Sequence, residues 1–118
     1  MKIYLIEFIG TFFLVLTIAL TGNPIPIGFV LVALVYMGGY ISGAHYNPAV
    51  TLAVFIRGKL KPNKIFGYMT SQVLGAFVAA FIAYVLIGKT FVPSPATGVA
   101  AWQAILVEIL FTFALCSV

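Results

Sequence analysis

Apolar residues fill most of this chain in four long runs, and short segments with glycine, proline or lysine separate them. The runs cover about residues 3–20, 25–40 and 64–87, and the fourth begins near Ala101. Runs of roughly 20 apolar residues are typical of transmembrane helices. The second run is short for a span, although a thinner bilayer can accommodate it. The pattern therefore predicts an all-α membrane protein.

A shorter apolar stretch follows the second run and begins at Asn47-Pro48-Ala49. Asn is a favoured N-cap and Pro is favoured at the first helical position, so we expect a helix start here. The helix covers about residues 47–57, or roughly 15 Å, which is half of a hydrocarbon core. The N-terminus of such a half-helix is tolerated at membrane depth only beside a polar cavity. The segment therefore predicts a pore or a binding site.

Composition and charge exclude several classes of protein. The chain is 64% hydrophobic and 7% charged, whereas about a quarter of the residues of a soluble domain are charged. The net charge of +4 does not indicate nucleic-acid binding, because five of the six basic residues lie at the start and in one short connection. These are Lys2, Arg57, Lys59, Lys61 and Lys64. The positive-inside rule predicts that the N-terminus and this connection are cytoplasmic.

The few groups capable of chemistry do not form an enzyme site. The chain has one cysteine, one histidine and two carboxylates, so we expect no metal site, no cofactor and no nucleophile–base pair. His45, next to the half-helix, is expected to hold the loop before it through a hydrogen bond.

Both carboxylates open the same pattern, E-x-x-x-T-F, at Glu7 and again at Glu108. Three spans lie between the two copies, so the second would enter the membrane from the opposite side, as in an inverted-topology repeat. We expect a first repeat over residues 1–100 and the start of a second, truncated repeat over 101–118. A buried acid needs a partner. Acceptance of N–H bonds from the irregular loop at residues 43–46 is favoured over proton relay or cation binding.

Residues 42–51, with Asn47-Pro48-Ala49, resemble the first signature loop of the aquaporins and glycerol facilitators, the major intrinsic proteins. The two E-x-x-x-T-F copies resemble the starts of that family's first and fourth helices, and Gln72 with Gly75 resembles its third. The resemblance implies an aquaporin-like helical bundle with re-entrant half-helices, homotetrameric at full length. This chain would supply the first inverted repeat and the start of the fourth transmembrane helix.

The resemblance also implies roles for particular residues. The Asn47 amide would donate to a solute in the pore, and carbonyls of Gly43, Ala44 and His45 would lead to it. Ile27 would line the constriction, with Leu31 below it on the same helix face. Of the two acids, the family pattern implies that Glu108 braces this loop, and that Glu7 braces a second loop that is absent from the sequence.

The leading hypothesis is a passive channel for water and small neutral solutes such as glycerol, multi-pass in a prokaryotic inner membrane. One alternative is a non-conducting truncated product or a structural membrane subunit. In keeping with it, we expect residues 1–118 alone not to form a selective pore. A third hypothesis is an ion-coupled transporter that uses the two acids.

Overall fold

The computed structural model describes residues 1–89 and 94–117, and these residues form five helices without a strand. The helices are α1 (Lys2–Thr21), α2 (Pro24–Ser42), α3 (Pro48–Ile56), α4 (Pro62–Ile87) and α5 (Ala101–Ser117). Three of them, α1, α2 and α4, are long and apolar enough to cross a membrane. The predicted all-α membrane architecture is confirmed. The expected division at residue 100 stays a prediction, and residues 90–93 and 118 of its two ranges lie outside the described residues.

Local chemistry fixes the ends of α2. Asn23 caps its start, because its side-chain oxygen accepts the Ile25 N–H at 3.0 Å, and Gly43 ends it in the left-handed conformation with φ of +91°. The helix has 19 residues, or about 28 Å at helical rise. The sequence pattern placed its end near Tyr40, which was wrong: the helix continues to Ser42, and α2 is a full span.

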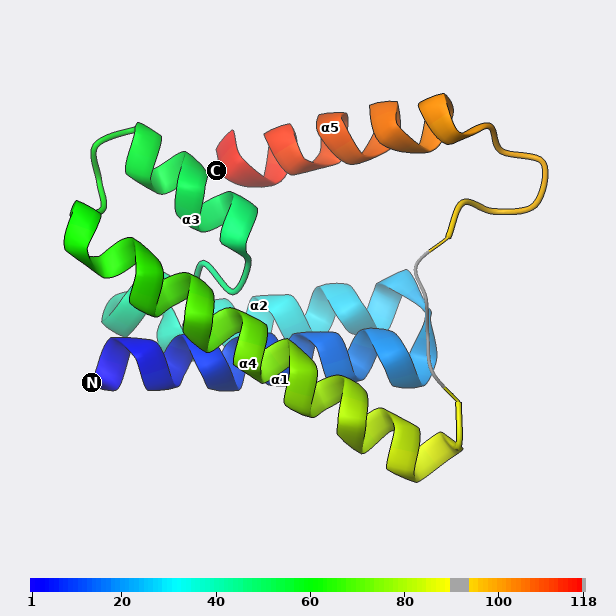
Figure 1. The fold of residues 1–118 in the computed structure, drawn as a ribbon, viewed down its shortest axis with the longest axis horizontal. Coiled ribbons are helices and arrows are strands. Elements are labelled where there is room, and N and C mark those ends of the chain that lie inside the picture. Colours follow the sequence, from blue (N-terminus) through cyan, green and yellow to red (C-terminus); the bar gives the residue numbers. More distant parts are fainter. Residues whose placement is uncertain (90–93, 118) are drawn as a thin grey trace.

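The short helix α3 lies between two spans and is re-entrant. Its nine residues cover about 14 Å, with Asn47 as N-cap and Pro48 in the first turn. From the loop beside α2 the helix runs back to the end of the molecule at which α4 begins (Figure 1). The predicted half-helix is therefore present.

Helices α1 and α4 cross at close range. Gly75, Ala79 and Ala83 are four residues apart and all are buried in α4. A Cβ atom at Gly75 would lie only 2.5 Å from the Phe8 carbonyl oxygen of α1. Small side chains let the two backbones approach, as is usual between membrane helices. This contact fixes α4 against the start of α1, where Glu7 lies.

Helix α5 lies apart from the other spans. Within the described ranges it packs against α3, whereas α1 packs against α2 and α4. In Figure 1 α5 runs along the edge of the molecule opposite α1, and its C-terminal end lies beside α3. Its acid, Glu108, is exposed.

Candidate functional site

The loop between α2 and α3 has an unusual backbone. Gly43, Ala44 and Tyr46 have φ of +91°, +52° and +49°. For the two residues other than glycine, this left-handed conformation costs about 1–2 kcal/mol each. Such a conformation persists only where the surroundings hold it. The surroundings therefore stabilise this loop conformation, and the hydrogen bonds of the loop N–H groups identify the residues that do so.

Glu7 of α1 accepts two of these N–H groups. Its carboxylate accepts the His45 N–H at 3.0 Å and the Tyr46 N–H at 2.7 Å. The same carboxylate accepts the Ser42 hydroxyl at 2.6 Å and the Gln72 side-chain amide at 2.8 Å. An ionised carboxylate has only acceptors, so it fits a position surrounded by four donors. Glu7 is fully buried, and it connects α1, α2, the loop and α4.

The expectation that Glu108 braces this loop was wrong, and Glu7 has that role. The reason is spatial: Glu108 lies on the exposed helix α5, where it lines a groove with Pro95 and Val99. Glu7 lies under the loop because α1 packs along both α2 and α4. Glu7 is thus the acid that accepts N–H groups of this loop.

A second group of polar side chains joins the loop to α3 and α4 at Thr51. The Thr51 hydroxyl lies 3.1 Å from His45 Nδ1, 2.9 Å from Gln72 Nε2 and 3.1 Å from the Asn47 carbonyl oxygen. Its single proton goes to the Asn47 carbonyl, so Gln72 and His45 Nδ1–H both donate to it. This assignment places the neutral His45 proton on Nδ1 and leaves Nε2 as an acceptor. The predicted loop-holding role of His45 rests on this contact.

Tyr46 fills a slot between α1 and α2 that sequence reasoning missed. Its ring lies against Gly10 of α1 and its hydroxyl against Gly38 of α2, where a Cβ atom would overlap it. The hydroxyl donates to the Leu34 carbonyl oxygen at 2.8 Å, and the Tyr46 carbonyl accepts the Thr11 hydroxyl at 3.1 Å. The signal in the sequence was the pair of glycines inside apolar helices, where glycine is otherwise unfavourable.

A cavity of about 300 Å³ lies beside the loop, between α1, α2, α3 and the end of α5. Its walls include five of the six residues predicted to line a pore, together with apolar side chains of the helices and Arg57. The lining residues are Leu14, Leu31, Val35, Gly43, Ala44, His45, Asn47, Val50, Val54, Arg57, Leu115 and Cys116. One wall is therefore polar loop backbone, and the remaining walls are mostly aliphatic.

Ile27, the sixth predicted pore residue, is not among the residues that line this cavity. It lies one helical turn before Leu31, and the cavity continues from Leu31 toward Val35 and the loop. The helix face was predicted from the three- and four-residue spacing, and that spacing also relates Leu31 to Val35. A role of Ile27 in a constriction stays a prediction.

Several polar groups of the cavity-lining residues have no hydrogen-bond partner within the described residues. Asn47 uses its side-chain oxygen to cap α3, accepting the Ala49 N–H at 2.7 Å. No hydrogen bond within residues 1–89 and 94–117 engages its Nδ2 or the carbonyl oxygens of Gly43, Ala44 and His45. These four cavity-lining residues therefore carry one amide donor and three carbonyl acceptors that are unpaired within the described residues. The described residues contain no group of three metal-ligating side chains.

Thr51→Val tests the second polar group with a side chain of the same shape. The substitution removes one of the two acceptors of Gln72 Nε2, which keeps its bond to Glu7, and the acceptor of His45 Nδ1, and both residues are buried. Each buried donor left without a partner costs about 1–3 kcal/mol. We expect the melting temperature in detergent, followed by circular dichroism, to fall by roughly 10 °C. Thr70→Val is the control, because the Thr70 hydroxyl is exposed and bonds only the Phe66 carbonyl of its own helix; an equal fall for both variants would contradict this account.

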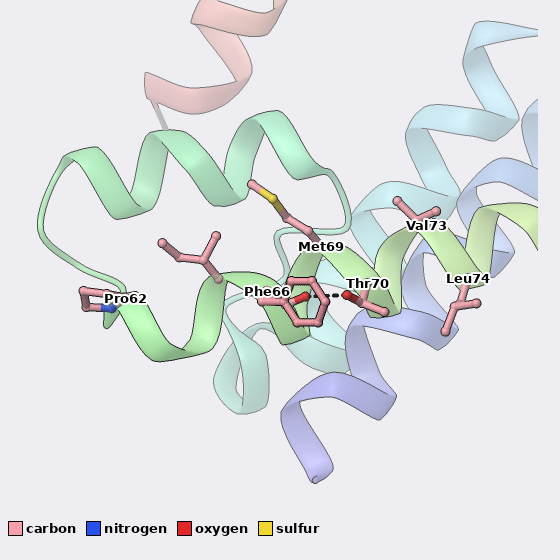
Figure 2. Close-up of a pocket in the computed structure, with 7 residues that line it drawn as sticks. Pro62, Phe66, Met69, Thr70, Val73 and Leu74 are labelled. Carbon is pink, nitrogen blue, oxygen red and sulfur yellow. Dashed lines mark hydrogen bonds between the residues drawn. The ribbon is translucent and has the colours of Figure 1, made fainter.

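Two further hollows flank the first half of α4 and carry no polar cluster. Groove A lies along one face of α4, as Figure 2 shows, and is lined by Pro62, Ile65, Phe66, Met69, Thr70, Val73 and Leu74. Groove B lies between α4 and the start of α1 and is lined by Met1, Lys2, Tyr4, Leu5, Phe8, Ser71 and Leu74. Both grooves lie outside the candidate site.

Known proteins share this sequence pattern. The chain is 32% identical to glycerol uptake facilitator protein-like 6 of Lactiplantibacillus plantarum, in a match that covers all of the chain and 63% of that protein. It is 35% identical to aquaporin AqpM of Methanothermobacter thermautotrophicus, over 92% of the chain and 60% of the relative. It is 31% identical to aquaporin NIP1-4 of Oryza sativa subsp. japonica, over 96% of the chain and 47% of the relative.

The chain thus spans about half to two thirds of the length of these three relatives. The sequence profile of the major intrinsic proteins matches residues 19–118, which include the half-helix, the loop before it and α4. The region matched contains every cavity-lining residue except Leu14. A match over most of the chain shows its family, and the chain belongs to the major intrinsic proteins.

Proposed function

We propose that this chain forms part of the wall of a passive transmembrane channel for water and small neutral solutes such as glycerol. The observation that carries the proposal is the cavity beside the loop, whose lining includes Asn47, Gly43, Ala44 and His45. A row of acceptors that ends at a donor can replace the hydrogen bonds of water as it leaves bulk solvent. The aliphatic walls formed by Leu31, Val50 and their neighbours offer few competing contacts.

In this proposal, the positive N-terminus of the half-helix helps to exclude cations. A helix N-terminus carries roughly half a positive charge, and the N-terminus of α3 lies at Asn47 beside the cavity. Arg57, at the other end of α3, also lines the cavity. Positive charge at both positions disfavours cations and protons while leaving neutral solutes unaffected.

The positions of the two acids give little support to the alternative hypothesis of an ion-coupled transporter. Glu7 is fully buried and already accepts four hydrogen bonds. Proton uptake there would disrupt the bonds that hold the loop. Glu108 lies on exposed α5 and outside the cavity. We therefore assign both acids no part in transport.

The wider assembly follows the family resemblance and remains part of the proposal. We propose a multi-pass protein of the inner membrane with a cytoplasmic N-terminus, which assembles as a homotetramer at full length. The clustered basic residues between α3 and α4, with Lys2, support this orientation through the positive-inside rule.

Asn47→Asp tests the proposed pore. Asp caps a helix as well as Asn does, so α3 is retained while the Nδ2 donor becomes a negative charge. We expect the native protein, at the length at which the cell makes it, to show osmotic water flux in proteoliposomes by stopped-flow light scattering. In the variant, water flux should fall several-fold and cation conductance should rise above the baseline of the unsubstituted protein.

Asn23→Asp is the matched control, because Asn23 caps α2 in the same way and does not line the cavity. It should leave both flux and conductance unchanged. Unchanged transport in Asn47→Asp would remove Asn47 from the pathway. Absence of flux above bare liposomes in the native protein would favour the non-conducting alternative.

A further inference from the structure

Grooves A and B are two neighbouring, mostly apolar grooves on the surface of the molecule. Groove A holds about 570 Å³ and groove B about 440 Å³, and both are lined by Leu74. The one hydroxyl in groove A, that of Thr70, is engaged with the Phe66 carbonyl at 2.7 Å (Figure 2). Groove A therefore offers an apolar surface without an unpaired side-chain donor, and groove B, which is also mostly apolar, shares Leu74 with it.

Basic side chains gather where the two grooves begin. Lys2 lines groove B, and Lys61 directly precedes Pro62, the first residue of groove A. Lys64 lies two helical turns before Ser71 on the same face of α4, toward groove B. The N-terminus and the start of α4 lie at the same end of the molecule (Figure 1). The two grooves thus share a positively charged end.

Within residues 1–89 and 94–117, no acid forms an ion pair with these lysines. The sequence has two carboxylates, and Glu7 is fully buried with its oxygens bonded to the loop and Gln72. Glu108 lies on α5 and lines a different groove. A cluster of basic residues just outside a membrane span attracts anionic lipid, at about 1 kcal/mol for each residue near the surface.

We propose that this surface binds one anionic phospholipid with two acyl chains. One chain occupies groove A and the other groove B, with Leu74 between them. The phosphate lies at the shared end, near Lys2, Lys61 and Lys64. The apolar pair of grooves selects a two-chain lipid, and the uncompensated lysines select a negative headgroup.

Native mass spectrometry of the purified protein in detergent tests this directly. The probes are phosphatidylglycerol, phosphatidylcholine with the same acyl chains, and lysophosphatidylglycerol, which has one chain. We expect phosphatidylglycerol to bind at least tenfold more tightly than phosphatidylcholine, and several-fold more tightly than the one-chain lipid. Equal binding of phosphatidylcholine, or displacement of phosphatidylglycerol by millimolar inorganic phosphate alone, would overturn the proposal.

Variants locate the two parts of the site. Lys61→Gln should weaken phosphatidylglycerol binding about fivefold, whereas Lys89→Gln, which removes one charge beyond the other end of α4, should not. Leu74→Asn should weaken binding of the two-chain lipid by at least fivefold. Its control is Leu86→Asn, because Leu74 and Leu86 are both more than half exposed on α4, so neither change disturbs the core. Equal effects within either pair would place the lipid elsewhere.

Discussion

Glu7→Gln is expected to lower the stability of the protein by about 3–6 kcal/mol. The glutamine keeps the size of the side chain but turns one carboxylate oxygen into a donor. Two of the four bonded groups would then face a donor, and each buried donor without an acceptor costs about 1–3 kcal/mol, more at a charged partner. The left-handed backbone at Ala44 and Tyr46 would lose the bonds that hold it. Circular dichroism on heating in detergent should show a melting temperature lower by more than about 10 °C.

Glu108→Gln is the matched control, since it makes the same chemical change in the second E-x-x-x-T-F copy. Glu108 is exposed on α5, and surface substitutions of this kind usually change stability by less than about 0.5 kcal/mol. A large loss for Glu108→Gln with a small loss for Glu7→Gln would restore the assignment that the sequence resemblance implied and contradict the hydrogen bonds found here.

Gly75→Leu is expected to lower the stability of the protein by a similar amount, because the larger side chain disrupts the packing of α1 against α4. The Cβ atom alone would meet the Phe8 carbonyl oxygen at 2.5 Å, and Phe12 N at 3.2 Å. Backbone atoms cannot rotate away as a side chain can, so α1 and α4 must separate. Overpacking usually costs 1–3 kcal/mol, and here we expect the upper end or more, because the separation would also strain the bond between Gln72 and Glu7.

Gly28→Leu provides the comparison for that packing effect. Gly28 lies in α2, and a Cβ atom there meets nothing within 4 Å. The substitution therefore adds the same side chain to a membrane helix without a clash. The melting temperature of Gly75→Leu should fall by about 10 °C or more while that of Gly28→Leu stays near the unsubstituted value. Similar melting temperatures would show that the close approach of α1 and α4 is unimportant.

Much of the fold could be predicted from the sequence because its signals are local. The starts of α2 and α3 follow from a capping Asn and an early Pro, and each acts within a few residues. The half-helix could be predicted for the same reason, since Asn47 and Pro48 begin it and its length follows from one apolar stretch.

The partner of each acid could not be read from the sequence in the same way. Glu7 and Glu108 open identical six-residue patterns, and no local rule says which one reaches a loop about 40 or 60 residues away. The structure distinguishes them because α1 packs against α2 and α4, whereas α5 packs against α3. Tyr46 was missed for a related reason: its slot combines Gly10 of one helix with Gly38 of another.

We propose that the loop held by Glu7 lines a pathway for water. The most direct measurement is the osmotic permeability of proteoliposomes that carry the native protein or one of two tryptophan variants of α2. Leu31→Trp enlarges a side chain that lines the cavity, whereas Phe29→Trp changes a side chain that is 73% exposed on the outer surface. We predict that Leu31→Trp loses most of the water permeability, that Phe29→Trp keeps it, and that both variants melt at similar temperatures. Equal permeability of the two variants would contradict the claim that water passes along this cavity.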